Sequence, residues 1–153
     1  MKHRKSEVSI FFSDEFIGYV FYKEDPKKPI FGELKLSRGI IVNGMILEPE
    51  ILLNELKKSF SQNQIKPNHI KMVLHEQNIL LRQYHLEKSS LGNKSIEDYL
   101  QTQIGKTIHT PFENPIISHH IKEETEQFYD VLLFTVDENF LHDYLDLFEY
   151  LNV

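Results

Sequence analysis

The sequence contains no cysteine. Disulfide bonds, thiolate metal sites and thiol catalysis are therefore excluded, which suits a cytosolic compartment. Long apolar runs are also missing, because the longest, such as residues 131–134, fall far short of a membrane span. The N-terminal residues lack the apolar core of a signal peptide. We therefore expect a cytoplasmic chain without direct membrane insertion.

The charge balance is acidic, with a formal net charge of −6 over 153 residues. Neutralising phosphates requires a basic face, so this balance argues against a nucleic-acid partner. The composition, with 41% hydrophobic and 26% charged residues, is that of a globular protein rather than a disordered one. The length allows one core or two small subdomains.

The sequence pattern of the first half of the chain predicts β-strands, then a helix, then further strands. Apolar and aromatic residues over 8–22, interrupted once at Ser13-Asp14-Glu15, predict two strands joined by a tight turn. The Asn43-Gly44 pair is a strong turn signal, and Pro49 opens a predicted helix over 48–61. The remaining predicted strands cover residues 30–36, 38–42, 70–74 and 78–86.

The second half of the chain also combines predicted strands with predicted helices. Ser95 begins a capping box before a predicted helix over 96–108, and Asp137 caps a final helix. Two strands lie between these helices, at 116–121 and 128–136. The predicted order is βββαβ followed by βαββα, with a seam at 76–78. This order predicts an α+β chain of two parts.

Four stretches of the sequence resemble a known family in their order and spacing. Residues 38–49 (RGIIVNGMILEP) join a glycine-bearing strand, an Asn-Gly turn and a helix start at Glu-Pro. An apolar strand at 70–74 precedes ILLRQYHL at 79–86, and the segment 96–112 ends in IHTPF. The strand YDVLLF at 129–134 leads into the closing helix. Together they resemble the N-terminal half of the type IV pilus assembly protein PilM family, which is related to the cell-division protein FtsA.

This resemblance implies an actin-like ATPase-type fold, with a partial 1A subdomain over residues 1–76 and a small 1C-type subdomain over 77–153. The rest of 1A and a second half would follow residue 153. The implied function is a non-catalytic scaffold in a type IV pilus, competence pseudopilus or type II secretion-like assembly. Its implied partner is the cytoplasmic N-terminal tail of a bitopic PilN-like protein, which would hold the chain at the inner face of the cell membrane.

The nucleotide loop that the resemblance implies is degenerate here, at Phe11, Ser13, Asp14 and Gly18. Phe11 stands where relatives that bind nucleotide carry an acid, and Gly18 where a basic residue is common. Asp14 either takes a metal role by a shifted register or, as we favour, belongs with Glu15 to a solvated turn. We therefore expect no enzyme activity and no cofactor.

Two other polar features are open to interpretation. His119 and His120 are adjacent strand residues that point to opposite faces, so we expect no shared metal ion. Arg82 lies on a largely apolar strand, where its guanidinium either contacts a ligand at the seam or reaches water or Glu87.

The resemblance also implies a groove between 1A and 1C that holds the partner's tail. The candidate lining residues are Ile41, Val42, Arg82, Tyr84, Ile104 and Phe112. Each of them also has an ordinary core or turn explanation. The rival functions are a degenerate actin-like ATPase and a filament-forming module. We also expect an uncovered apolar face or strand edge, and hence a homodimer.

Overall fold

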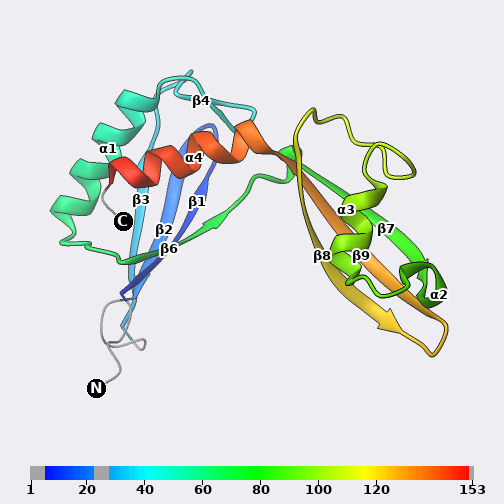
Figure 1. The fold of residues 1–153 in the computed structure, drawn as a ribbon. Helices are drawn as coiled ribbons and strands as arrows, with labels where there is room; N and C mark the ends of the chain where they lie inside the picture. The colour runs from blue at the N-terminus through cyan, green and yellow to red at the C-terminus, as the bar shows by residue number, and fades with distance from the viewer. Residues whose placement is uncertain (1–5, 23–27, 152–153) are drawn as a thin grey trace. The chain divides into compact units, whose positions relative to one another are not determined.

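The computed structural model describes residues 6–22 and 28–151, which fall into two compact units (Figure 1). Unit 1 comprises Met1–Gln77 and His142–Val153, and unit 2 comprises Asn78–Leu141. The change of unit after Gln77 falls in the predicted seam. The sequence analysis had placed residues 142–153 in the second part, whereas their contacts assign them to unit 1.

A four-stranded sheet forms the base of unit 1, in the order β3-β2-β1-β6. Strands β1 (Glu7–Phe12), β2 (Phe16–Tyr22) and β3 (Ile30–Lys35) are antiparallel, and β6 (His69–Val73) runs parallel to β1. Alternate residues of β1 and β2 are buried, so one face of the sheet belongs to the core. A small hairpin, β4 (Ile41–Val42) and β5 (Met45–Ile46), turns at Asn43-Gly44 as predicted.

Two helices cover that core face. Helix α1 (Pro49–Gln62) buries Leu52, Leu56 and Phe60, which lie on one side of the helix. Helix α4 (Glu138–Tyr150) contributes Tyr144 and Phe148, whose rings lie 4.9 and 6.0 Å from that of Phe12. These aromatic contacts explain why the second part of α4 belongs to unit 1. Among the described residues, no helix is long and apolar enough to cross a membrane.

Close packing of β2 against β3 depends on one glycine. The Tyr19 ring lies across Gly32, where an added Cβ would overlap the ring. The Tyr19 hydroxyl then reaches α1, where it lies 2.9 Å from Ser59 Oγ and accepts a 3.0 Å bond from Asn63 Nδ2. Gly32 therefore allows a buried polar link between the sheet and the helix.

Unit 2 is a three-stranded antiparallel sheet in the order β7-β9-β8. Its strands are β7 (Ile79–Glu87), β8 (Pro115–Glu124) and β9 (Phe128–Asp137), and its helices are the short α2 (Lys88–Leu91) and α3 (Ile96–Gln103). The Ser95 cap is confirmed, since Ser95 Oγ accepts a 3.0 Å bond from Asp98 N. Helix α3 ends before the predicted residue 108, because Ile104 is extended and Gly105 has a φ of 77°. A short 3₁₀ turn, Glu76–Asn78, precedes β7.

Candidate functional site

The turn between β1 and β2 stands where the resemblance implies a nucleotide loop, and its polar groups bond to one another. Ser13 Oγ accepts bonds from the amides of Phe16 (3.0 Å) and Glu15 (3.3 Å), and Ser13 N donates to Phe16 O at 2.9 Å. Backbone amides that cradle a phosphate must point toward the ligand. Here the amides of Glu15 and Phe16 close the turn instead.

Asp14 links this turn to the β4–β5 hairpin. Its Oδ2 accepts a 2.8 Å bond from Asn43 N, and its Oδ1 accepts a 3.0 Å bond from Gly44 N. Both turn residues have positive φ, 52° at Asn43 and 76° at Gly44, so the carboxylate holds a conformation that glycine and asparagine adopt most readily. Asp14 is therefore a structural link between two turns rather than a merely solvated side chain.

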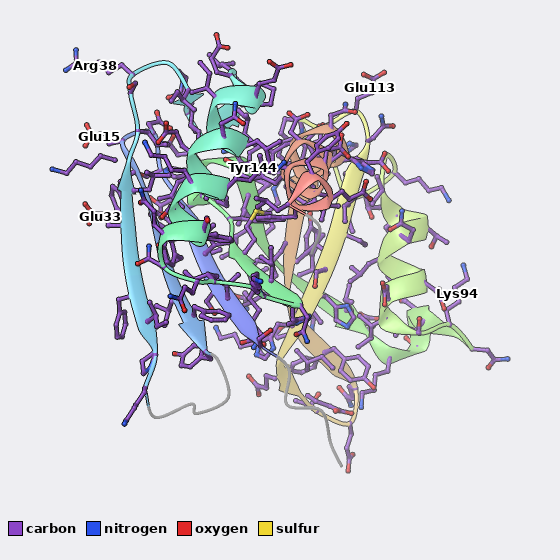
Figure 2. The ribbon with its side chains drawn as sticks, turned by 90° about the vertical axis from the view of Figure 1, so that its left-hand side faces the viewer. Glu15, Glu33, Arg38, Lys94, Glu113 and Tyr144 are labelled. Atoms are coloured by element: carbon purple, nitrogen blue, oxygen red, sulfur yellow. The ribbon has the colours of Figure 1, made fainter. Side chains whose placement is uncertain are left out.

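Tyr144 completes this polar cluster from α4. Its hydroxyl donates a buried 2.6 Å bond to Gly44 O, and Figure 2 shows Tyr144 on the side of α4 that faces the strands of unit 1. Burial, followed by the nearby Asp14 and Asp143 carboxylates, raises the pKa of Tyr144 well above its ordinary value. The hydroxyl therefore stays protonated, and remains a donor, to higher pH than an ordinary tyrosine.

Phe11 and Gly18, the other two residues of the implied loop, lie on the opposite surface of the sheet. We call this surface the open face; its hollow of about 620 Å³ is lined by Ser9, Phe11, Gly18, Val20, Phe31, Glu33 and Val73 together with neighbouring backbone. No described helix covers it, and Figure 2 shows Glu33 on the side of β3 away from α1. Phe31 is 72% exposed and Val73 54%. Within residues 6–22 and 28–151, the expected uncovered apolar face is thus present.

The predicted groove residues are distributed over the two units. In unit 1, Ile41 is 1% exposed and belongs to the core, and it pairs with Ile46, while Val42 pairs with Met45. The other four lie in unit 2, where Tyr84 and Ile104 pack against its apolar core. Ile41 is therefore a core residue, the ordinary alternative to a groove residue that the sequence analysis had left open.

Arg82 has a backbone partner within unit 2. Its Nη1 donates to His109 O at 2.5 Å, so its guanidinium contacts the segment after α3 rather than Glu87. Phe112 follows in the same segment, where Thr110 Oγ1 accepts a 3.2 Å bond from its amide. Register places Arg82 and Tyr84 on one face of β7, opposite Leu133 and Val131 of β9.

No metal centre is found in the part of the chain that the structure describes. No three side chains among its histidines, aspartates and glutamates lie close enough to hold an ion. His119 and His120 occupy successive positions of β8, paired with Leu133 and Leu132. Their side chains therefore emerge on opposite faces of that strand.

A groove between α1 and α4 was missed by the sequence analysis. It has a volume of about 520 Å³, lies within unit 1, and is lined by Ile46, Pro49, Glu50, Leu53, Asp143, Asp146, Leu147 and Tyr150. The four α4 residues are spaced i, i+3, i+4 and i+7, which places them on one side of a helix. That spacing could have indicated from the sequence that these four residues share one side of α4. Only the structure shows that α1 forms the other side of the groove.

Comparison with known proteins gives a match in structure only. No family model matches the sequence, and no curated protein matches it. A chain of the PilM–PilN type IV pilus biogenesis complex aligns with 94% of this chain at a TM-score of 0.75 and 14% identity. A Bacteroides thetaiotaomicron protein with an actin-like ATPase fold and unknown function aligns with 97% at a TM-score of 0.44 and 14% identity. This chain covers 44% and 51% of those two chains.

The likeness to the PilM–PilN chain confirms the predicted fold class. The α+β arrangement, a four-stranded unit followed by a three-stranded unit, is shared with part of a solved chain more than twice as long. At 14% identity the similarity is one of fold. Function therefore depends on the residues that this fold positions.

Proposed function

We propose that this chain is a non-catalytic scaffold in type IV pilus assembly or a related competence or secretion apparatus, where it binds the cytoplasmic tail of a bitopic PilN-like protein. The observation that carries the proposal is the fold likeness, over nearly the whole chain, to part of a PilM–PilN complex. The sequence motifs that resemble the PilM family support it independently. Through this partner, the chain acts at the cytoplasmic face of the membrane.

The absence of catalysis in this proposal is supported by the β1–β2 turn. Phe11 supplies no metal ligand at the position where the family motif has an acid. Both Asp14 oxygens already accept backbone bonds, and Ser13 Oγ holds the amides of Glu15 and Phe16. Phosphate binding here requires these bonds to break without a compensating metal ligand.

The tail site is proposed around Arg82 and Tyr84 of unit 2. The bond to His109 O uses one of the five N–H donors of a guanidinium, so the remaining donors are compatible with a peptide carbonyl or carboxylate. Arg82 is exposed, whereas Tyr84 is half-buried against the unit 2 core. The pair therefore offers donors beside apolar surface, which are the two features a bound peptide needs.

The test is titration of the full chain with a synthetic cytoplasmic tail of the PilN-like protein from the same genome. Arg82→Ala should weaken binding by about tenfold or more, the effect of losing a charge-assisted bond. Arg38→Ala is the matched control, because Arg38 is an exposed arginine of unit 1. Chemical-shift changes confined to other residues would reject the site, and absence of binding by the wild-type chain would reject the function.

A second candidate function, self-association, is favoured by the open face. The exposed Phe31 ring and the hollow at Gly18 lie on the same face of the sheet. A two-fold interface must be self-complementary, and here the Phe31 ring of each copy would enter the hollow of the other. Phe31→Ser should then abolish a dimer detected by sedimentation at micromolar concentration. Tyr150→Ser is the control, since Tyr150 is an aromatic of similar exposure, at 66% against 72% for Phe31, outside the open face. A wild-type chain that sediments as a monomer at every concentration excludes this candidate.

A further inference from the structure

The groove between α1 and α4 combines an apolar floor with an acidic rim. Its floor comes from Ile46, Pro49, Leu53 and Leu147. Its carboxylates are Glu50 on α1 and Asp143 and Asp146 on α4, all exposed. Tyr150, 66% exposed, stands at the end of the same side of α4.

The charged residues that line this groove are all acidic. No lysine or arginine lines it, and no ion pair of Glu50, Asp143 or Asp146 is found among the described residues. The last turn of α4 carries no basic residue to offset the partial negative charge of the helix end. The chain as a whole has a net charge of −6. The groove therefore favours a cationic occupant.

The geometry of the groove distinguishes between possible occupants. A single metal ion does not fit, because no three acidic or histidine side chains of the described chain lie close enough to hold one. A second copy of this chain is also disfavoured, since a two-fold contact at the groove would place its carboxylates against those of the other copy. The apolar floor instead matches a segment that carries both cationic and apolar side chains.

We propose that this groove binds a short basic segment whose apolar side chains enter between α1 and α4 while its lysines or arginines meet Glu50, Asp143 and Asp146. The source of that segment rests on the proposed function: the cytoplasmic flank of a membrane-spanning helix is enriched in lysine and arginine. The membrane-proximal stretch of the partner's tail therefore has the required chemistry. The groove belongs to unit 1, whereas Arg82 belongs to unit 2.

The experiment uses the full chain and a fluorescent synthetic peptide with four lysines around two leucines spaced i, i+3. A second peptide of the same length carries glutamates in place of the lysines. The lysine peptide should bind, with an affinity that falls as salt is raised, and the glutamate peptide should not. Equal binding of both peptides would overturn the charge argument.

Substitutions then locate the peptide. Combining Asp143→Asn with Asp146→Asn should weaken binding by about fivefold to tenfold, the sum of two exposed ion pairs. Tyr150→Ala should weaken it by about threefold through lost apolar contact. The matched control combines Glu123→Gln with Glu126→Gln, which removes the same charge from exposed positions of unit 2. An equal loss in the control pair would mean that net charge, rather than the groove, attracts the peptide.

Titrating the same variants with the partner's full tail separates the two proposals. If the tail binds the Asp143→Asn/Asp146→Asn chain as it binds the wild type, the proposed function stands and the groove assignment is wrong. If the tail does not bind at all while the lysine peptide binds at the groove, the proposed function fails and the cationic site stands. If the aspartate variant changes sedimentation rather than peptide binding, the occupant is a second copy and the proposal is overturned.

Discussion

The two units differ in where their polar links lie. Unit 1 has buried links between segments far apart in the sequence, namely Tyr144 to Gly44 and Tyr19 to Ser59. The described side-chain links of unit 2 between segments far apart in the sequence, such as Arg82 to His109 O, are exposed. Buried polar bonds specify one arrangement strongly, whereas exposed ion pairs contribute little. Unit 1 should therefore be the more sensitive of the two to single changes.

The difference in chain continuity is equally informative. Unit 2 is one uninterrupted segment, Asn78–Leu141, with its core on Leu100, Val131 and Leu133. Unit 1 is assembled from two separated segments, and the described part of its second segment supplies three buried side chains, Tyr144, Leu147 and Phe148. The stability of unit 1 thus depends on residues that arrive after unit 2 in the sequence.

The largest expected effect follows from that dependence. Deleting residues 142–153 removes Tyr144 and Phe148 from contact with Phe12 and exposes the core of unit 1. Amide hydrogen exchange should then show lost protection in β1, β2 and β6 but retained protection in β7 and β9. Leu145→Ser, at a 46% exposed position of α4, should leave both units protected. Equal loss in both units would show that they unfold together.

A second prediction concerns the packing of Tyr19. Gly32→Ala should destabilise unit 1 by about 3 kcal/mol, since the new Cβ overlaps the Tyr19 ring and the core is already filled. Urea denaturation measures the change. Gly18→Ala is the control, because its Cβ would lie 3.7 Å from Phe16, an ordinary contact. Adding Tyr19→Leu should recover part of the loss, whereas a purely additive double variant would contradict the overlap.

Much of the fold could be predicted because its signals are local. The β1–β2 turn at Ser13, the caps at Ser95 and Asp137, and the Asn43-Gly44 turn all lie where the sequence placed them. Each depends on the residues of its own turn. The short helix α2 was missed, since four residues carry no periodicity.

The candidate sites were less predictable because they depend on tertiary contacts. The bonds of Asp14 join residues 29 and 30 positions apart, and Arg82 bonds a backbone carbonyl, which no sequence pattern marks. In the groove between α1 and α4, the spacing of the α4 residues could be recognised in the sequence, but the other side of the groove comes from a helix far away in the sequence. The alternation and spacing of polar residues predict which side of a helix or strand is polar. They do not predict which other helix or strand packs against that side.

The third prediction tests Asp14 as a structural residue. Asp14→Ala should lower the free energy of unfolding by about 2 kcal/mol, because the amides of Asn43 and Gly44 lose a charged acceptor. The loss should be the same with and without Mg²⁺, and calorimetric titration of the wild type with Mg-ATP should show no site. Mg²⁺-dependent stabilisation of the wild type that Asp14→Ala abolishes would instead assign Asp14 a metal role.

The smallest effect is expected at Tyr144 and depends on pH. Tyr144→Phe should cost about 1 kcal/mol at neutral pH, since Gly44 O loses its buried donor. Burial, with Asp14 and Asp143, raises the pKa of Tyr144 in the folded state above the ordinary 10.0, so the stability from this group is complete below that pH. As pH rises above 10.0, the unfolded state loses the phenol proton first, and stability falls.

The comparison that isolates this contribution is the change in urea midpoint between neutral and strongly alkaline pH. Lysines and other tyrosines titrate in both proteins, so only the difference between wild type and Tyr144→Phe reports on this hydroxyl. The variant should lose less stability than the wild type over that interval, because phenylalanine has no proton to release. Tyr150→Phe, at a 66% exposed position, should follow the wild type. Parallel curves for Tyr144→Phe and wild type would mean that the hydroxyl in unit 1 is less buried than its bond to Gly44 requires.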